Sequence, residues 1–332
     1  MFRPFTPQAL LGMIAALAAM LLLPLLSTDP YLMHVMVLVM IFGIFASAWN
    51  LVTGFAGLKT FGHHAFFGLG AYGSALMSIH LGLSPWLTLW LGGLLAGAAG
   101  LLIGTPILRI RSMPHVAIVT LGFAEIVRIC IANLSGLTRG EMGLWGIPQF
   151  QGFTLPVVGK VSFTPADKVS FYYLALALTV LTLFVIVRLM RSKTGLAMLA
   201  MRDGEDAAES LGVNLTRLKL MVFGLSAFIV GIAGGFYAHY LSILTPQSAV
   251  GVDLMISIIA MVLVGGLGTF SGPLAGALVL TVLIEALRDL ENYRLLGYGL
   301  LIVLIVMFLP RGIVTLRERL TFRQQEQADH GR

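Results

Sequence analysis

The sequence predicts an all-α polytopic membrane protein with about ten transmembrane or re-entrant helices and both termini in the cytoplasm. Of its 332 residues, 58% are hydrophobic and only 11% are charged, whereas soluble proteins carry about 25% charged residues. Apolar runs of about 20 residues, the length that crosses a bilayer, follow one another along the chain. We therefore expect one membrane domain over residues 1–316, followed by a polar cytoplasmic tail over residues 317–332.

Ten apolar runs define the expected spans. The first could also be a signal peptide, but no small-residue cleavage site follows it, so we interpret it as a span. The third, eighth and ninth runs are short or rich in glycine. In chain order, the predicted spans are Ala9–Leu26, Leu32–Leu51, Phe61–His80, Pro85–Leu108, His115–Leu134, Ser170–Leu189, Leu218–Leu241, Leu254–Leu267, Pro273–Leu287 and Leu295–Leu309.

Basic residues predict the orientation of these spans. Lys and Arg gather in the loops on one side, which the positive-inside rule assigns to the cytoplasm. The formal net charge of +6 is therefore interpreted as a topology signal and not as a nucleic-acid binding surface. Two loops are long: an outer loop, residues 135–169, and a cytoplasmic loop, residues 190–217. Alternating residues after Phe153 and after Val161 favour a small hairpin or an amphipathic cap in the outer loop.

Glycine is abundant, with 38 residues, and its clusters predict breaks in helices. Glycine lets membrane helices approach closely, but the density over residues 265–272 exceeds that need and is typical of a broken helix in a transporter. The segment 57–62 faintly echoes the segment 266–272, which suggests an internal duplication. The helix-break candidates are Gly57, Gly62, Gly265, Gly266, Gly268 and Gly272. Polar residues near the first break are the translocation-pathway candidates: Asn50, Thr53, Thr60, His63 and Tyr72.

Several kinds of chemistry are not indicated. The chain has no phosphate-binding loop, no nucleophile elbow and no zinc-protease motif. His63 and His64 are adjacent, so on a helix they point about 100° apart and are poor ligands for one metal. Cys130 stands alone, so a disulfide within the chain is impossible, and we expect it to pack as a small hydrophobic residue. We predict no catalytic residue, no metal site and no cofactor in this chain.

Charged residues within the spans are few and have potential partners. Glu125 and Arg128 are three residues apart, so they can touch on one helix, and Glu285 precedes Arg288 by one turn. We interpret both as structural pairs. Ion-driven secondary transporters usually need central carboxylates without such partners, so this pattern argues against that class.

The cytoplasmic loop carries the most informative pattern. Residues 206–211 are expected to form a short helix, with acidic residues in its first turn favoured by the helix dipole. Gly212 suits a C-cap and Asn214 an N-cap. A short rigid helix of this kind suits docking into another protein, although a solvated connector has the same appearance.

Several segments then resemble one family in the same order along the chain. Asp206-Ala-Ala-x-x-x-Gly212 resembles the EAA-x3-G loop of ABC importer permeases, although no I-x-L-P follows it. Its local form is similar to that of the branched-chain amino acid permeases of the LivM type. Further stretches resemble that family around residues 49–72, 117–128, 137–148, 264–273 and 308–312. Leu58-Lys59-Thr60 departs from the Gln-Leu-Ser that often stands there.

The resemblance implies a permease subunit of an ATP-driven importer for branched-chain or other hydrophobic amino acids in the bacterial inner membrane. It implies a second, LivH-type permease, two cytoplasmic ATPases that bind the ATP and magnesium, and a periplasmic solute-binding protein as partners. The implied ATPase-coupling residues are Asp206, Ala207, Ala208, Glu209 and Gly212.

Three alternatives stay open at this point. A permease for urea or short amides looks much alike, and an ion-coupled secondary transporter needs no ATPase. A channel or purely structural membrane subunit is the third alternative.

Overall fold

The protein is a bundle of apolar helices. The computed structural model describes residues 7–107, 113–155, 159–164 and 167–287, together with positions 299, 307 and 312. Within them, six helical stretches are long and apolar enough to cross a membrane. The long helices are α1 (Pro7–Leu26), α2 (Pro30–Asn50), α3 (His63–Leu81), α4 (Pro85–Ile107), α5 (Met113–Asn133), α7 (Lys168–Met190), α10 (Leu215–Leu241), α12 (Val252–Gly265) and α13 (Gly272–Ala286).

Short elements connect the long helices. A π-helical turn, η1 (Leu51–Phe55), extends α2, and a 3-10 turn, η2 (Gly140–Met142), lies in the outer loop. The short helices are α6 (Ser135–Thr138), α8 (Lys193–Asp203), α9 (Glu205–Ser210) and α11 (Pro246–Val250). The strands are β1 (Leu144–Trp145), β2 (Phe153–Leu155), β3 (Gly159–Val161) and β4 (Ile243–Leu244).

The first nine predicted spans coincide with the nine long helices, so the prediction of an all-helical polytopic membrane protein is confirmed. The tenth predicted span, Leu295–Leu309, and the tail, residues 317–332, lie outside the described residues. The total of ten spans and the cytoplasmic placement of both termini therefore stay predictions.

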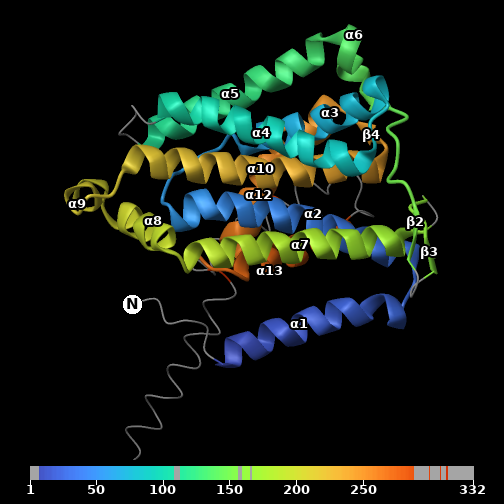
Figure 1. The fold of residues 1–332 in the computed structure, drawn as a ribbon, viewed down its shortest axis with the longest axis horizontal. Coiled ribbons are helices and arrows are strands. Elements are labelled where there is room, and N and C mark those ends of the chain that lie inside the picture. The colour runs from blue at the N-terminus through green and yellow to red at the C-terminus, as the bar shows by residue number, and fades with distance from the viewer. Residues whose placement is uncertain are drawn as a thin grey trace, which may run out of the picture.

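Helices α2 and α10 form the centre of the bundle (Figure 1). In the helical stretch that contains α2, 83% of an 18-residue apolar segment is buried inside the bundle. For the stretch that contains α5, the buried share is only 28%. α5 is therefore a peripheral helix with one face left open. α1 lies beside α7, where the Tyr172 hydroxyl donates a hydrogen bond to the Met20 carbonyl at 2.6 Å.

Glycines allow the inner helices to touch. A Cβ added to Gly70 of α3 would meet the backbone of Gly231 in α10, and one added to Gly234 would meet the Phe67 carbonyl. Close backbone contact of this kind replaces the hydrophobic driving force that helices lack in lipid. Cys130 is an exception to the predicted packing: it lies exposed on the open face of α5, so the expectation that it is buried is wrong.

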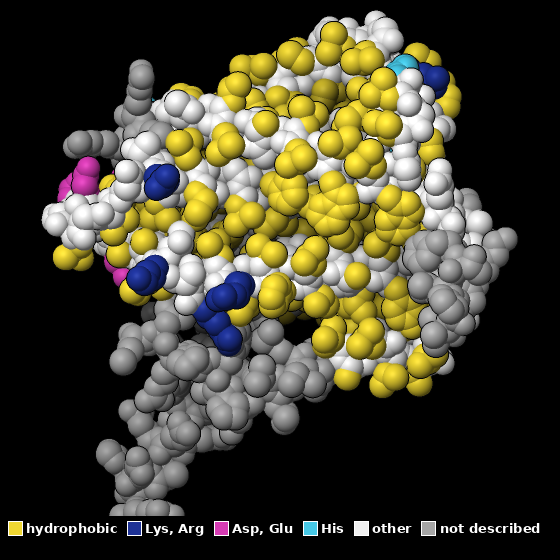
Figure 2. Space-filling view, viewed as in Figure 1, with side chains coloured by type: hydrophobic (Ala, Val, Ile, Leu, Met, Phe, Trp, Pro, Cys, Tyr) yellow, Lys and Arg dark blue, Asp and Glu magenta, His cyan; other side chains and the backbone are white. Residues whose placement is uncertain are grey.

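The two ends of the bundle differ. α8 and α9 lie at one end, and the four strands lie at the other (Figure 1). There β2 and β3 form the predicted antiparallel hairpin, and β1 pairs with β4. Figure 2 shows a broad hydrophobic band between the ends, with Lys and Arg side chains gathered mainly toward the end that carries α8 and α9.

Candidate functional site

The helix α9 stands between two glycines at one end of the bundle. It begins after Gly204 and ends before Gly212, whose φ of +84° is a left-handed conformation that favours glycine. The Gly212 N–H donates to the Glu209 carbonyl at 2.9 Å, and the Val213 N–H donates to the Ala208 carbonyl at 3.1 Å. These two bonds form a Schellman cap, which gives the short helix a defined end, as the sequence predicts.

α9 is fixed at its base and open on its outer face. Ala208 is buried, whereas the other four predicted coupling residues are exposed: Asp206, Ala207, Glu209 and Gly212. Glu205 pairs with Lys219 of α10 at 2.6 Å. The Asn214 side chain accepts a hydrogen bond from the Arg217 N–H at 2.9 Å and caps α10, as predicted.

α8 was not predicted from the sequence, and it carries a contact to the first helix break. Arg202, near its end, donates a hydrogen bond from Nη1 to the Gly54 carbonyl in η1 at 3.2 Å. The Arg202 side chain also lies against Gly57, where φ is +78° and a Cβ would be within 2.9 Å of Arg202 Cγ. The polar end of the molecule is therefore joined directly to the break between α2 and α3.

The two glycine-rich breaks, more than 200 residues apart in the sequence, lie together. The Asn50 amide nitrogen donates to the Thr269 carbonyl at 2.9 Å, and the Gly268 N–H donates to the Asn50 side-chain oxygen at 2.8 Å. The rings of Phe55 and Phe270 lie 5.0 Å apart. A buried asparagine thus bridges both breaks and satisfies backbone groups that the interrupted helices leave free.

The predicted break glycines stand where the backbone is left-handed or closely packed. Gly266 and Gly268 have φ of +127° and +74°. A Cβ on Gly265 would meet the Gly272 carbonyl, and one on Gly62 would meet the backbone of Thr120 in α5. The chain is non-helical over residues 56–62 and 266–271, between α2–η1 and α3 and between α12 and α13.

Thr60 and His63 belong to a buried polar network at the start of α3. His63 Nδ1 lies 3.2 Å from Thr60 Oγ1, and its Nε2 lies 3.0 Å from Ser226 Oγ of α10. Ser226 in turn donates to the Ala48 carbonyl at 2.7 Å, and Trp49 Nε1 donates to the Thr60 carbonyl at 2.8 Å. This network ties α2, α3 and α10 together.

The five predicted pathway residues are therefore placed inside the bundle. Asn50, Thr60, His63 and Tyr72 are buried, and the half-buried Thr53 donates to the Leu58 carbonyl at 3.0 Å. The structure brings Asn50 to the second break and Thr60 to His63, and it separates both from Tyr72. A role for the five in solute passage stays a prediction.

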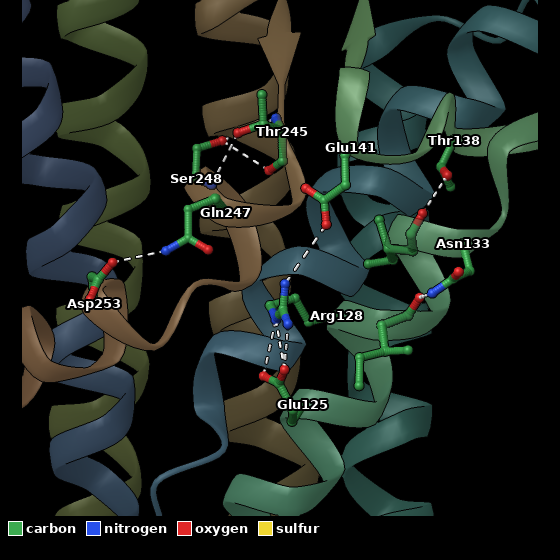
Figure 3. A network of polar contacts seen from close by, with 11 residues as sticks. Glu125, Arg128, Asn133, Thr138, Glu141, Thr245, Gln247, Ser248 and Asp253 are labelled. Atoms are coloured by element: carbon green, nitrogen blue, oxygen red, sulfur yellow. Dashed lines mark hydrogen bonds and ion pairs between the residues drawn. The ribbon is translucent and has the colours of Figure 1, made fainter.

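A second polar cluster lies on α5 near the opposite end. Arg128 donates from Nε to both carboxylate oxygens of Glu125, at 2.9 and 3.0 Å, which confirms the predicted pair. Glu141 of η2 adds a second carboxylate, 3.8 Å from Arg128 Nη1. Figure 3 shows Arg128 between the two carboxylates. The sequence could not reveal the part of Glu141, because only the folded outer loop brings η2 to α5.

Glu285, the other predicted pair member, accepts a hydrogen bond from the Tyr31 hydroxyl at 2.8 Å. Its expected partner, Arg288, lies outside the described residues.

Broken apolar helices around a polar core, with a capped polar helix at one end, define a multi-pass membrane protein of the transporter class. The family of permease components of branched-chain amino acid transport systems matches residues 31–309. The chain belongs to this family.

Individual relatives agree with the family match. The LivM permease protein of Salmonella typhimurium is 38% identical over 83% of this chain and 68% of its own length. LivM of Escherichia coli is 37% identical over 84% of this chain and 69% of its own length. The LivH permease protein of Salmonella typhimurium is 25% identical over 82% of this chain and 91% of its own length. No solved structure matches the chain.

Proposed function

We propose that this chain is the LivM-type transmembrane subunit of an ATP-driven importer for branched-chain or other hydrophobic amino acids in a bacterial inner membrane. The observation that carries the proposal is the connection from the exposed helix α9, through α8 and Arg202, to the break at Gly54 and Gly57. Membership of the permease family supports the solute class.

The proposed orientation puts α8 and α9 in the cytoplasm. Arg188, Arg191, Lys193, Arg202 and Arg217 all lie on the end of α7, on α8 or at the start of α10, where the positive-inside rule expects them. The strands β1 to β4 then face the periplasm.

In the proposed mechanism, two ATPase subunits bind ATP and magnesium and close on each other, and α9 follows that movement. α9 is held to α10 by the Glu205–Lys219 pair, and α8 is held to η1 by Arg202. A shift of the pair of helices would therefore act on the two breaks that Asn50 joins. Discrete rearrangement of packed elements of this kind underlies alternating access.

The proposed partners are a second, LivH-type permease, the two ATPases and a periplasmic solute-binding protein. The exposed coupling residues Asp206, Ala207, Glu209 and Gly212 supply the contact for an ATPase. The chain itself is proposed to be no enzyme and to carry no cofactor.

Uptake in proteoliposomes tests this function. The complex purified with this chain in mild detergent is reconstituted with ATP on the α9 side, and labelled leucine is added with the binding protein. We expect uptake against a leucine gradient that requires ATP. Uptake driven by a proton or sodium gradient without ATP would establish a secondary transporter instead, and passive equilibration would indicate a channel. ATP-driven uptake of urea or acetamide in place of leucine would establish the amide permease.

A further inference from the structure

Two buried polar side chains of α3 make no side-chain hydrogen bond within the described residues. In the part of the chain that the structure describes, the Tyr72 hydroxyl has no hydrogen-bond partner. The His64 imidazole makes no hydrogen bond of normal geometry there and interacts with the backbone of Phe61. His64 is 0% exposed and Tyr72 is 3% exposed. Buried polar groups without partners cost folding free energy. Each of them therefore calls for an explanation, and a bound ligand is one.

Both side chains lie on the α3 face that is turned toward the α5 cluster. His64, Gly68 and Tyr72 are four residues apart and so share one face of the helix. A Cβ at Gly68 would meet Val250 of α11, which packs against α3 and α5. α3 contacts both α5, which carries Glu125, and α6, which directly precedes Glu141 in η2.

The cluster itself has unused binding capacity. Arg128 spends Nε and Nη2 on Glu125, whereas its Nη1 is 3.8 Å from Glu141, which is beyond hydrogen-bond length. The three charged side chains carry one more negative than positive charge. Glu141 is 67% exposed and can turn toward a cation.

The position of the cluster excludes a lipid-facing role. Glu125 is eight positions before the end of α5 at Asn133, about 12 Å along the helix axis. A partly exposed ion pair at such depth is costly in lipid and faces water or protein instead. The turn of α5 that carries Glu125 and Arg128 therefore faces water or protein in the assembled transporter, while Ile118 and Ile126 leave other parts of the same helix apolar.

We infer that Glu125, Arg128 and Glu141, backed by His64 and Tyr72, form a binding station for the charged end of a zwitterionic amino acid on its way through the importer. Arg128 takes the α-carboxylate through Nη1, the nitrogen that it does not use on Glu125. Glu141 takes the α-ammonium, and the Tyr72 hydroxyl and His64 complete the polar contacts. Ile129, one helical turn after Glu125 and exposed, offers an apolar surface to an aliphatic side chain. This inference rests on the proposed import function.

A variant in which the two charges are exchanged distinguishes a solute-binding role from a purely structural ion pair. The double variant Glu125→Arg with Arg128→Glu keeps a pair on the same helix turn but moves the cation by three residues. In the reconstituted complex we expect its leucine uptake to fall by about tenfold or more in kcat/KM, because a charged hydrogen bond to the solute is misplaced. Its thermal stability and its assembly with the ATPases are measured alongside, because Arg128→Glu brings a second carboxylate close to Glu141. Wild-type uptake by the exchanged variant would overturn the inference.

Removal of one hydroxyl gives an independent test that does not depend on the pair. Tyr72→Phe deletes an oxygen without a partner among the described residues, so a structural role predicts no loss. We expect a severalfold higher KM for leucine. Tyr173→Phe, on α7 where the hydroxyl bonds to Leu21, is the matched control and should leave the KM unchanged.

An unchanged KM in Tyr72→Phe would contradict the station even where the exchanged pair is impaired. Failure of the wild-type complex to import leucine at all would instead contradict the proposed function, so the two failures are distinguishable.

Discussion

Arg202 donates a hydrogen bond to the carbonyl oxygen of Gly54 at 3.2 Å, and this bond joins the polar end of the bundle to the first helix break. Gly54 belongs to the π-helical turn η1, a form of helix that is often found at functional sites. The same arginine lies close to Gly57 and Gly268. One side chain therefore contacts both glycine-rich segments.

We predict that Arg202→Ala separates ATP hydrolysis from uptake. Without the guanidinium, α8 loses its contact with η1, so movement of α9 is no longer passed to the break. Leucine uptake should fall by roughly tenfold, the effect of losing a charged hydrogen bond, while ATP hydrolysis continues. The measurement is the number of ATP molecules hydrolysed for each leucine imported. Arg188→Ala, an exposed arginine near the end of α7, is the control.

Gly212→Pro is expected to uncouple the transporter while insertion into the membrane stays normal. Proline holds φ near −65° and lacks the N–H that bonds to Glu209, so the cap of α9 cannot form. Gly212→Ala is the milder comparison: it has space for its Cβ and costs only the left-handed backbone, about 1 kcal/mol. Uptake assays on both variants check this, and normal uptake by the proline variant would refute it.

Ser226→Ala should destabilise the subunit through His63. The serine hydroxyl is the partner of His63 Nε2 and donates to the Ala48 carbonyl. Its loss leaves buried polar atoms unsatisfied, at a cost of about 1–3 kcal/mol. Thermal unfolding in detergent measures the change, with the exposed Ser135→Ala as the control. Equal melting temperatures for the two variants would show that the network contributes little.

Gly234→Ala should disturb the packing of α10 on α3, whereas Gly122→Ala should not. A Cβ on Gly234 would meet the Phe67 carbonyl, so the helices must separate, which costs about 1–3 kcal/mol. A Cβ on Gly122 of α5 meets nothing within 4 Å. Melting temperatures of the two variants in detergent, compared with the wild type, test the difference. A loss of stability in Gly122→Ala alone would contradict the arrangement of helices.

Long apolar runs made the helices predictable, because a bilayer accepts few other structures. The caps of α9 and α10 were also readable, since Gly212 and Asn214 act through local backbone geometry. The α8 helix was missed because its 11 residues carry no apolar run long enough for a span. Gly57 lies in the non-helical segment 56–62 with φ of +78°, a local backbone conformation that favours glycine.

Contacts between distant segments were beyond the sequence. Nothing near Asn50 indicates that it bonds to Gly268 and Thr269, because this depends on how two breaks pack in three dimensions. The sequence also does not distinguish His63 from its neighbour His64. The fold places His63 in a satisfied network and leaves its neighbour without a hydrogen bond of normal geometry among the described residues.

Helix α10 has 27 residues, so it is about 40 Å long. It starts at the cap beside α9 and ends at Leu241. In its last turn, His239 Nδ1 lies 2.7 Å from the Pro148 carbonyl of the outer loop. The helix packs closely against α3 and α4 through glycines, so it has little space in which to bend. In the proposed assembly, the binding protein and the ATPases would contact opposite ends of this one rigid helix, so solute delivery and ATP hydrolysis could be coordinated through a single element.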